Sequence, residues 1–329
     1  MNQKYADLSS LTFWKAYWTT MRPYLLFVSG AAGMVGFVDG VERGISVSIG
    51  VFFVFFFAYG FGQALTDCFQ IDTDSISSPY RPMVQGIISQ RQVLPVSLIG
   101  LLAGCAILLL LNPWTIIPGL LCVAGLASYT YFKRRWWGGP FYNAWIVALL
   151  PVIGKMAAVG TVSSLLSVFA SGILVPIIIS VFFSYANFVL MGYFKDISAD
   201  RASGYNTFVV IYGWKRAAVG SDIFMLLSLF TTGWGISRVL RSESFLSLRW
   251  ISVPVFLAAL VVLIFAQVGI HRTRDEKEAY RPIAHVVRGF ILLRLAEICV
   301  LRPAWIYLVA LFYLSFELAL KKRPEKEQV

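Results

Sequence analysis

Long runs of apolar residues alternate with short polar segments along almost the whole chain. A helix needs about 20 apolar residues to cross the hydrocarbon core of a bilayer. Runs of this kind occupy residues 23–40, 45–66, 92–111, 114–132, 141–163, 168–194, 217–237, 250–270 and 289–320. The pattern predicts an all-α, polytopic membrane protein with about nine transmembrane helices, the last of them long and open to a break. Residues 1–22 then form an interfacial amino-terminal segment, 23–320 a single transmembrane domain and 321–329 a polar tail.

Composition agrees with this pattern and excludes several classes of protein. The chain has 329 residues, of which 58% are hydrophobic and 14% charged, whereas soluble domains carry about 25% charge. Its net charge of +11 comes from basic residues scattered over short loops, so no nucleic-acid partner is expected. Four cysteines without a Cys-x-x-Cys spacing and two histidines in one charged loop do not indicate disulfides or zinc.

The basic residues of the loops predict the orientation in the membrane. With nine spans, the segments on the side of the amino terminus carry 17 Lys and Arg, and those on the opposite side carry 8. Short cytoplasmic loops of membrane proteins carry the excess of Lys and Arg. We therefore expect the amino terminus to lie in the cytoplasm, with the protein in a plasma membrane of bacterial type.

Carboxylates follow the apolar run 45–66 directly. If the helix continues, Asp67, Gln70 and Asp74 share one face, and Asp72 lies on a different face of the helix. An acidic stripe at a membrane boundary is costly without a cation, and carboxylates select hard ions such as Mg²⁺. Because Mg²⁺ normally completes its coordination shell with water and phosphate oxygens, the expected ligand is a diphosphate.

A second acidic segment follows the run 168–194. Asp196 and Asp200 lie one helical turn apart, and four crossings separate them from Asp67, so both segments emerge on the same side. Two carboxylate groups with Arg or Lys nearby can clamp a diphosphate through metal ions. The sequence therefore predicts one shared site at this end of the helices.

These two segments make the chain resemble the UbiA superfamily of intramembrane prenyltransferases. The first motif of that family reads roughly Asn-Asp-x-x-Asp-x-x-x-Asp, followed by Arg-Pro. In this chain the motif begins with Thr66 in place of Asn, has Gln70 in place of the second Asp and ends at Pro82. The second motif, from Lys195 to Thr207, has the Lys-Asp, Asp-Arg, Gly and Thr of the family in register.

The resemblance implies a ring of two four-helix repeats plus one helix, with a cytoplasmic cap. It also implies Mg²⁺-dependent transfer of a prenyl chain from an allylic isoprenyl diphosphate to a lipophilic acceptor, aromatic or quinone-like, inside the lipid bilayer. Diphosphate is released. The sequence leaves prenyl chain length, acceptor identity and oligomeric state open.

Chemistry and resemblance together give the expected site residues. The expected catalytic residues and metal ligands are Asp67, Asp74, Asp196 and Asp200, with Asp72 as a further metal ligand. The expected contacts to the diphosphate are Arg81, Lys133, Lys195, Arg201 and Gln70. Asn187 either lines the same cavity or forms an interhelical hydrogen bond.

Several alternatives stay open at this point. Asp72 reaches the metal only if the helix unwinds after Asp67, and in a regular helix it is a surface acid. A terpene cyclase, which closes the prenyl chain on itself, fits the altered first motif as well. A prenyl-lipid carrier without enzymatic activity would need no Mg²⁺ and release no diphosphate.

Two further features predict packing inside the membrane. Gly30, Gly33 and Gly36 in the first apolar run lack the spacing of a phosphate-binding loop and favour close helix packing. Arg294 and Glu297 lie one turn apart in the last run and are expected to neutralise each other.

Overall fold

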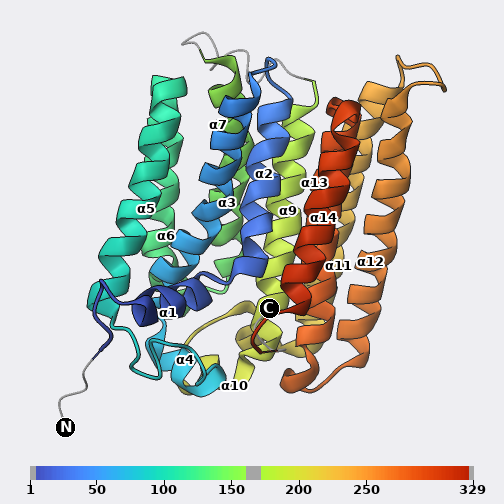
Figure 1. Ribbon diagram of the computed structural model, residues 1–329. Coiled ribbons are helices and arrows are strands. Elements are labelled where there is room, and N and C mark those ends of the chain that lie inside the picture. The colour runs from blue at the N-terminus through green and yellow to red at the C-terminus, as the bar shows by residue number, and fades with distance from the viewer. Residues whose placement is uncertain (1–4, 161–171, 326–329) are drawn as a thin grey trace.

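The computed structural model describes residues 5–160 and 172–325, and within these ranges the chain is nearly all helical (Figure 1). The long helices are α2 (Leu26–Val38), α3 (Ile45–Asp67), α5 (Gln90–Leu111), α6 (Ile116–Arg135), α7 (Gly139–Val159), α9 (Leu174–Gly192), α11 (Phe208–Leu240), α12 (Ser252–Arg272), α13 (Tyr280–Leu301) and α14 (Ile306–Lys321). The short helices are α1 (Leu11–Met21), α4 (Ile71–Ser77) and α10 (Ile197–Ala202). Turns of 3₁₀ helix are η1 (Pro23–Leu25), η2 (Pro113–Thr115), η3 (Tyr193–Lys195), η4 (Leu248–Ile251), η5 (Glu276–Glu278) and η6 (Pro303–Trp305).

The number of apolar helices is close to the expectation of about nine. Eight helices among the described residues, α13 not being one of them, are long and apolar enough to cross a membrane. A ninth span results if α1 and the segment from η1 through α2, which are bent by 43°, are counted as one. The expected runs 141–163 and 168–194 each include residues outside the described ranges. The all-α, multi-pass architecture is therefore confirmed.

The main difference from the expectation lies in residues 289–320, which form two helices instead of one span. α13 ends at Leu301 because Arg302 leaves the helical conformation (φ −134°, ψ 72°) and Pro303 starts a new turn. Arg288 Nε of α13 lies 2.7 Å from Glu317 Oε1 of α14, so the two helices run antiparallel. The carboxyl-terminal end therefore lies at the same end of the bundle as α1 (Figure 1).

This extra crossing strengthens the charge asymmetry. It moves Lys321, Lys322 and Arg323 to the side of the amino terminus and places Arg302 in the turn on the opposite side, which changes the tally from 17 against 8 to 20 against 5. Lys326, which lies outside the described residues, is left out of the new tally. The excess of Lys and Arg on the side of the amino terminus is therefore larger than in the nine-span topology, and it supports the same orientation.

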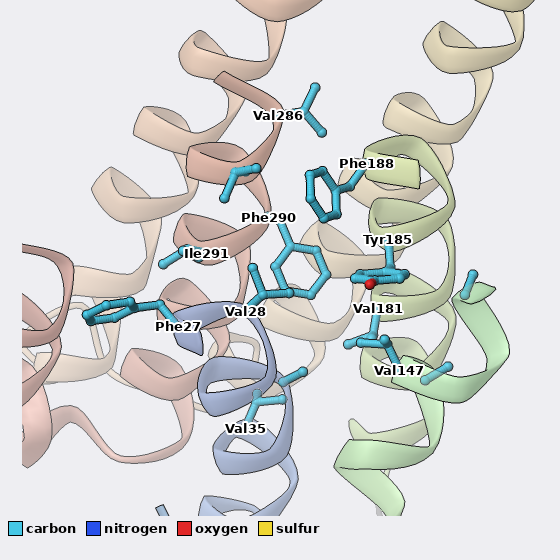
Figure 2. Packing of buried hydrophobic residues seen from close by; sticks show 14 of the residues in the cluster. Phe27, Val28, Val35, Val147, Val181, Tyr185, Phe188, Val286, Phe290 and Ile291 are labelled. Atoms are coloured by element: carbon cyan, nitrogen blue, oxygen red, sulfur yellow. The ribbon is translucent and has the colours of Figure 1, made fainter. Parts of the chain in front are cut away.

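Four helices, α2, α7, α9 and α13, pack together in the middle of the bundle. Figure 2 shows Val35 of α2, Val147 of α7, Tyr185 of α9 and Phe290 of α13 pointing toward one another. The backbones of α2 and α7 touch, because a Cβ on Gly36 would lie 1.9 Å from the carbonyl oxygen of Pro151 on α7. The prediction that glycines in this run serve close helix packing is confirmed.

The charged pair in α13 is shielded from lipid by the surrounding helices. Arg294 and Glu297 are 0% and 1% exposed, and Arg294 Nη2 lies 3.2 Å from Glu297 Oε1. Arg294 also donates to the hydroxyl of Ser180 on α9, and Thr232 on α11 donates to Glu297 at 3.1 Å. The predicted neutralisation is confirmed, and the pair ties three helices together.

The order of elements repeats along the chain. In the first half, α2 and α3 are followed by the short α4 and then by α5 and α6. In the second half, α7 and α9 are followed by the short α10 and then by α11 and α12. α4 and α10 lie beside each other at the same end of the bundle (Figure 1). This arrangement brings the two acidic segments together.

Candidate active site

The first acidic segment is positioned by a break in the helix. α3 ends at Asp67, and Gln70 (φ −124°, ψ 18°) turns the chain into α4. The turn folds Asp74 back toward Asp67, and Arg81 binds both carboxylates. Arg81 Nη1 lies 3.4 Å from Asp67 Oδ1 and forms a closer ion pair with Asp74. The break after Asp67 thus pairs it with Asp74.

A second arginine, Arg22, binds Asp67 from the other end of the sequence. It lies between α1 and η1 in a left-handed conformation (φ 53°), and its Nη2 is 3.1 Å from each oxygen of Asp67. Gln63 Nε2 donates to Asp67 Oδ1 at 2.6 Å. Asp67 is only 2% exposed, so two guanidinium groups and an amide together stabilise its buried charge.

The second acidic segment is formed by η3 and α10. Asp196 stands at the start of α10, and Asp200, one turn later, is fully buried. Lys133 from the end of α6 reaches Asp200, with its Nζ 3.5 Å from Oδ1. Among the described residues, the two carboxylate oxygens of Asp200 have no hydrogen-bond partner besides this ion pair. A buried acceptor of this kind favours the approach of a cation.

Burial changes the acidity of both motifs. It raises the pKa of Asp74 to about 6, although Arg81 opposes the change, and it raises the pKa of Asp200 to about 6, although Lys133 opposes it. Each carboxyl group therefore lies within reach of protonation in mildly acidic solution.

Lys133 connects the two motifs. Its Nζ donates to Gln70 Oε1 at 3.1 Å and also lies close to Asp200. The amide nitrogen of Gln70 donates to Thr130 at 3.2 Å. Gln70, which stands where the resemblance predicts an aspartate, is thus oriented by hydrogen bonds on both of its amide atoms.

A polar pocket lies between the two acidic segments. Its lining consists of Arg22, Tyr59, Gln63, Thr66, Asp67, Gln70, Asp74, Arg81, Tyr129, Lys133, Asn143, Tyr185, Phe188, Val189, Gly192, Tyr193, Lys195 and Asp196. The structure therefore brings together most of the predicted site residues, and Asp200 lies directly behind the pocket against Lys133.

Besides Asp200, three predicted residues do not line this pocket. Asp72 points to the surface, where it pairs with Arg134 Nη2 at 2.7 Å and accepts a hydrogen bond from Tyr205 at 3.3 Å. Arg201 is exposed. Asn187 accepts a hydrogen bond from Ser221 of α11, so it takes the interhelical role that the sequence offered as an alternative.

An apolar pocket adjoins the polar one. It is lined by Ser29, Tyr185 and parts of four helices: Val54 to Thr66 of α3, Gly100 to Leu108 of α5, Gly119 to Leu126 of α6 and Asn143 to Ile153 of α7. Tyr59, Gln63, Thr66, Asn143 and Tyr185 line both pockets. A ligand with a charged head and an apolar tail could therefore occupy both at once.

Sequence reasoning missed several residues of the polar pocket. Arg22 lies outside both acidic motifs, and its contact with Asp67 spans 45 positions. Tyr129 and Tyr193 bind each other through their hydroxyl groups at 2.8 Å, and both line the pocket. The spacing of Tyr129 and Lys133, one turn apart on α6, is the signal that could have found the tyrosine.

The donor set suits Mg²⁺ in chemistry. The described residues contain no cluster of three or more His, Cys, Asp or Glu side chains placed to hold an ion by themselves. The carboxylates stand in two pairs, one from each half of the chain, and in the described part of the chain Lys133 is the ion-pair partner of Asp200. Mg²⁺ usually takes one or two carboxylates and completes its shell with phosphate oxygens and water, so two such pairs fit a Mg²⁺ diphosphate.

Comparison with known proteins identifies the family. The model of the UbiA prenyltransferase family matches residues 24–293. The chain belongs to this family. The digeranylgeranylglyceryl phosphate synthase of Pyrococcus abyssi is 28% identical over 225 residues, which cover 66% of this chain and 76% of that protein.

Solved structures of UbiA homologues share the fold. The homologue from Aeropyrum pernix K1 superposes with a TM-score of 0.68 at 16% identity, covering 83% of this chain and 96% of the other. A homologue from Archaeoglobus fulgidus, determined with GPP and Mg²⁺, gives a TM-score of 0.60 at 18% identity over 87% of this chain and all of its own. As a UbiA-family protein, the chain is a prenyltransferase-type membrane enzyme.

Proposed function

We propose that this UbiA-family protein transfers a prenyl chain from an allylic isoprenyl diphosphate to a lipophilic acceptor inside the membrane and releases diphosphate. The observation that supports this most is the continuity of the polar and apolar pockets, which share five lining residues. The diphosphate would lie among the charged side chains, and the prenyl chain would extend into the apolar pocket.

The charged side chains divide into two groups. Asp67 and Asp74 from one half, with Asp196 and Asp200 from the other, would hold Mg²⁺. When bound, Mg²⁺ neutralises charge on the departing diphosphate and so lowers the barrier to ionisation. The basic side chains of Arg22, Arg81, Lys133 and Lys195 face the same pocket or lie in its wall, and they would bind phosphate oxygens directly.

The reaction breaks the allylic carbon–oxygen bond, and the diphosphate leaves with the electron pair. The allylic cation that remains is attacked by the acceptor, and the acceptor then loses a proton. Tyr59 and Tyr185 line both pockets, and Tyr129 and Tyr193 line the polar one. Their ring faces can stabilise the cation, and the surrounding helices keep water out.

Two observations on related proteins support the substrates. A UbiA homologue from Archaeoglobus fulgidus has been determined with GPP and Mg²⁺, and another structure holds DMAPP and Mg²⁺. The Pyrococcus relatives are named for a glyceryl phosphate product. We expect an acceptor that enters from the bilayer, either aromatic and quinone-like or a prenylated glyceryl phosphate.

We also propose that the pocket and the amino terminus face the cytoplasm of a bacterial-type plasma membrane, on the ground of the charge asymmetry. Residues 1–22 would lie at the interface, because α1 meets the following helix at a bend, and 23–320 would form one domain. Residues 321–329 would form a cytoplasmic tail.

The test is product analysis of the purified protein in nanodiscs. Isoprenyl diphosphates of C10 to C20 are supplied with Mg²⁺ and with either an aromatic quinone precursor or a prenylated glyceryl phosphate, and products are identified by mass spectrometry. Asp67→Asn and Asp196→Asn should abolish transfer, whereas Asp222→Asn, which changes a partly exposed carboxylate bound to His271, should retain it.

The alternatives give different results in the same assay. A terpene cyclase would release diphosphate and a cyclised product without any acceptor. A prenyl-lipid carrier would bind the donor without Mg²⁺ and release no diphosphate. Either result would overturn the proposed transfer reaction.

A further inference from the structure

The apolar pocket has a measurable depth. It begins where it joins the polar pocket, at Thr66 on α3 and Asn143 on α7, and its most distant lining residues on these helices are Val54 and Ile153. A helix rises 1.5 Å per residue, so the pocket is about 15 to 18 Å long.

The far end of the pocket is closed by packed side chains. Leu108 of α5 and Ile153 of α7 are 5% and 2% exposed, and both line the pocket. One turn beyond Leu108, the buried Asn112 donates to the carbonyl oxygen of Met156 at 2.9 Å, which ties the end of α5 to α7. Among the described residues, the lining of the pocket does not continue past Leu108 on α5 or Ile153 on α7.

The length of a prenyl chain can be compared with this depth. Three backbone bonds of an extended polypeptide span about 3.6 Å, so the four chain bonds of an isoprene unit span roughly 4.8 Å. A pocket of about 15 to 18 Å holds about three such units in extended form. The unit that carries the diphosphate lies outside it, in the polar pocket.

We infer that the donor site accepts chains of up to four isoprene units, and that Leu108 and Ile153 set this limit. The inference rests on the proposed function, because it assigns the apolar pocket to the prenyl chain of the donor. A fifth unit would have to displace the two buried side chains, fold back on itself or leave the pocket sideways between the helices. Chain length is therefore decided at the end of the bundle opposite to the acidic residues.

The experiment measures kcat/KM for C10, C15, C20 and C25 diphosphates by release of diphosphate, with Mg²⁺ and an acceptor. For the wild type we expect kcat/KM to stay constant or rise from C10 to C20. At C25 it should drop at least about tenfold, as expected for a pocket that must reject additional methylene groups. Leu108→Ala and Ile153→Ala should each raise the ratio of C25 to C20 by about tenfold.

A substitution in the opposite direction and a matched control complete the test. Leu108→Phe should lower the value for C20 relative to C15, because the larger ring occupies the space of the last unit. Leu110→Ala on the same helix changes a side chain that is 84% exposed, and the length profile should stay that of the wild type.

Two outcomes separate this inference from the proposed function. If the wild type transfers prenyl groups but all variants keep the wild-type length profile, or if the wild type uses C25 as well as C20, the limit does not lie at Leu108 and Ile153. If the wild type releases no diphosphate with any donor, the proposed function itself is overturned.

Discussion

Asp72 and Asp74 should respond differently to removal of their charge, although they lie two positions apart. Asp74 faces the polar pocket and is bound by Arg81, whereas Asp72 lies at the surface and is bound by Arg134 and Tyr205. We predict that Asp72→Asn leaves the Mg²⁺ requirement unchanged and that Asp74→Asn raises it strongly.

The expected magnitudes follow from exposure. The side chains of Arg134 and Asp72 are 36% and 42% exposed, and ion pairs between exposed groups contribute about 0 to 1 kcal/mol. Asn at position 72 can still accept the hydrogen bond from Tyr205, so the loss in kcat/KM should stay below about fivefold. Asp74→Asn would remove a charged metal ligand from the polar pocket, and for this we predict a loss in kcat/KM of more than about a hundredfold, which corresponds to about 2.7 kcal/mol of barrier.

The assay is a Mg²⁺ titration of diphosphate release with both variants and the wild type. The concentration of Mg²⁺ for half-maximal rate should be the same for the wild type and Asp72→Asn. Gln70→Asp in the Asp72→Asn background serves as the control, because a carboxylate at position 70 could substitute for a lost ligand. A severalfold rise in Asp72→Asn that Gln70→Asp reverses would refute the surface role of Asp72 and make it a metal ligand.

Three further predictions concern acidity, topology and packing. In the metal-free protein the folded state raises the pKa of Asp74 and Asp200 to about 6 from 3.8, so ionisation opposes folding and the thermal stability should increase as the pH falls from 7 to 5. Changing both residues to Asn should make the melting temperature less dependent on pH, and an unchanged dependence would contradict this cause. Lys322→Cys is introduced into a protein without its natural cysteines. It should resist an impermeant maleimide in intact cells, because α14 returns the chain to the side of the acidic segments. Labelling from outside would support the nine-span topology instead. Glu297→Ala should destabilise the protein by about 3 to 5 kcal/mol, whereas Arg294→Met with Glu297→Leu should cost far less in denaturation experiments, and equal losses would contradict mutual neutralisation.

The sequence predicts the fold well because membrane helices are specified locally. Each run of about 20 apolar residues forms its helix whatever surrounds it, and the family motifs place the acidic residues at one end. For residues 289–320 the sequence predicts one long span and leaves a break open, and the structure places a turn at Arg302 and Pro303 inside this apolar stretch. The apolar pattern continues across the turn, so hydropathy alone could not separate α13 from α14.

The site is less predictable, because its contacts join distant parts of the chain. Helical spacing correctly places Asp72 on a different face from Asp67 and Asp74. It cannot show that the helix ends at Asp67, or that Asp72 stays outside the polar pocket after this break. Arg22 reaches Asp67 only because its own backbone adopts a left-handed conformation that nothing in the local sequence demands.

The departure at Gln70 becomes understandable when the two halves are considered together. An aspartate there would add a third buried carboxylate beside Asp67 and Asp74 and would attract Lys133 away from Asp200. Glutamine keeps an oxygen in the same place, and that oxygen accepts a hydrogen bond from Lys133 without adding charge. The ammonium of Lys133 can then remain 3.5 Å from Asp200, whose oxygens have no other partner in the part of the chain that the structure describes. The loss of one acid in the first motif is thus linked to the charge balance of the second, which is a relation that neither motif reveals when it is considered alone.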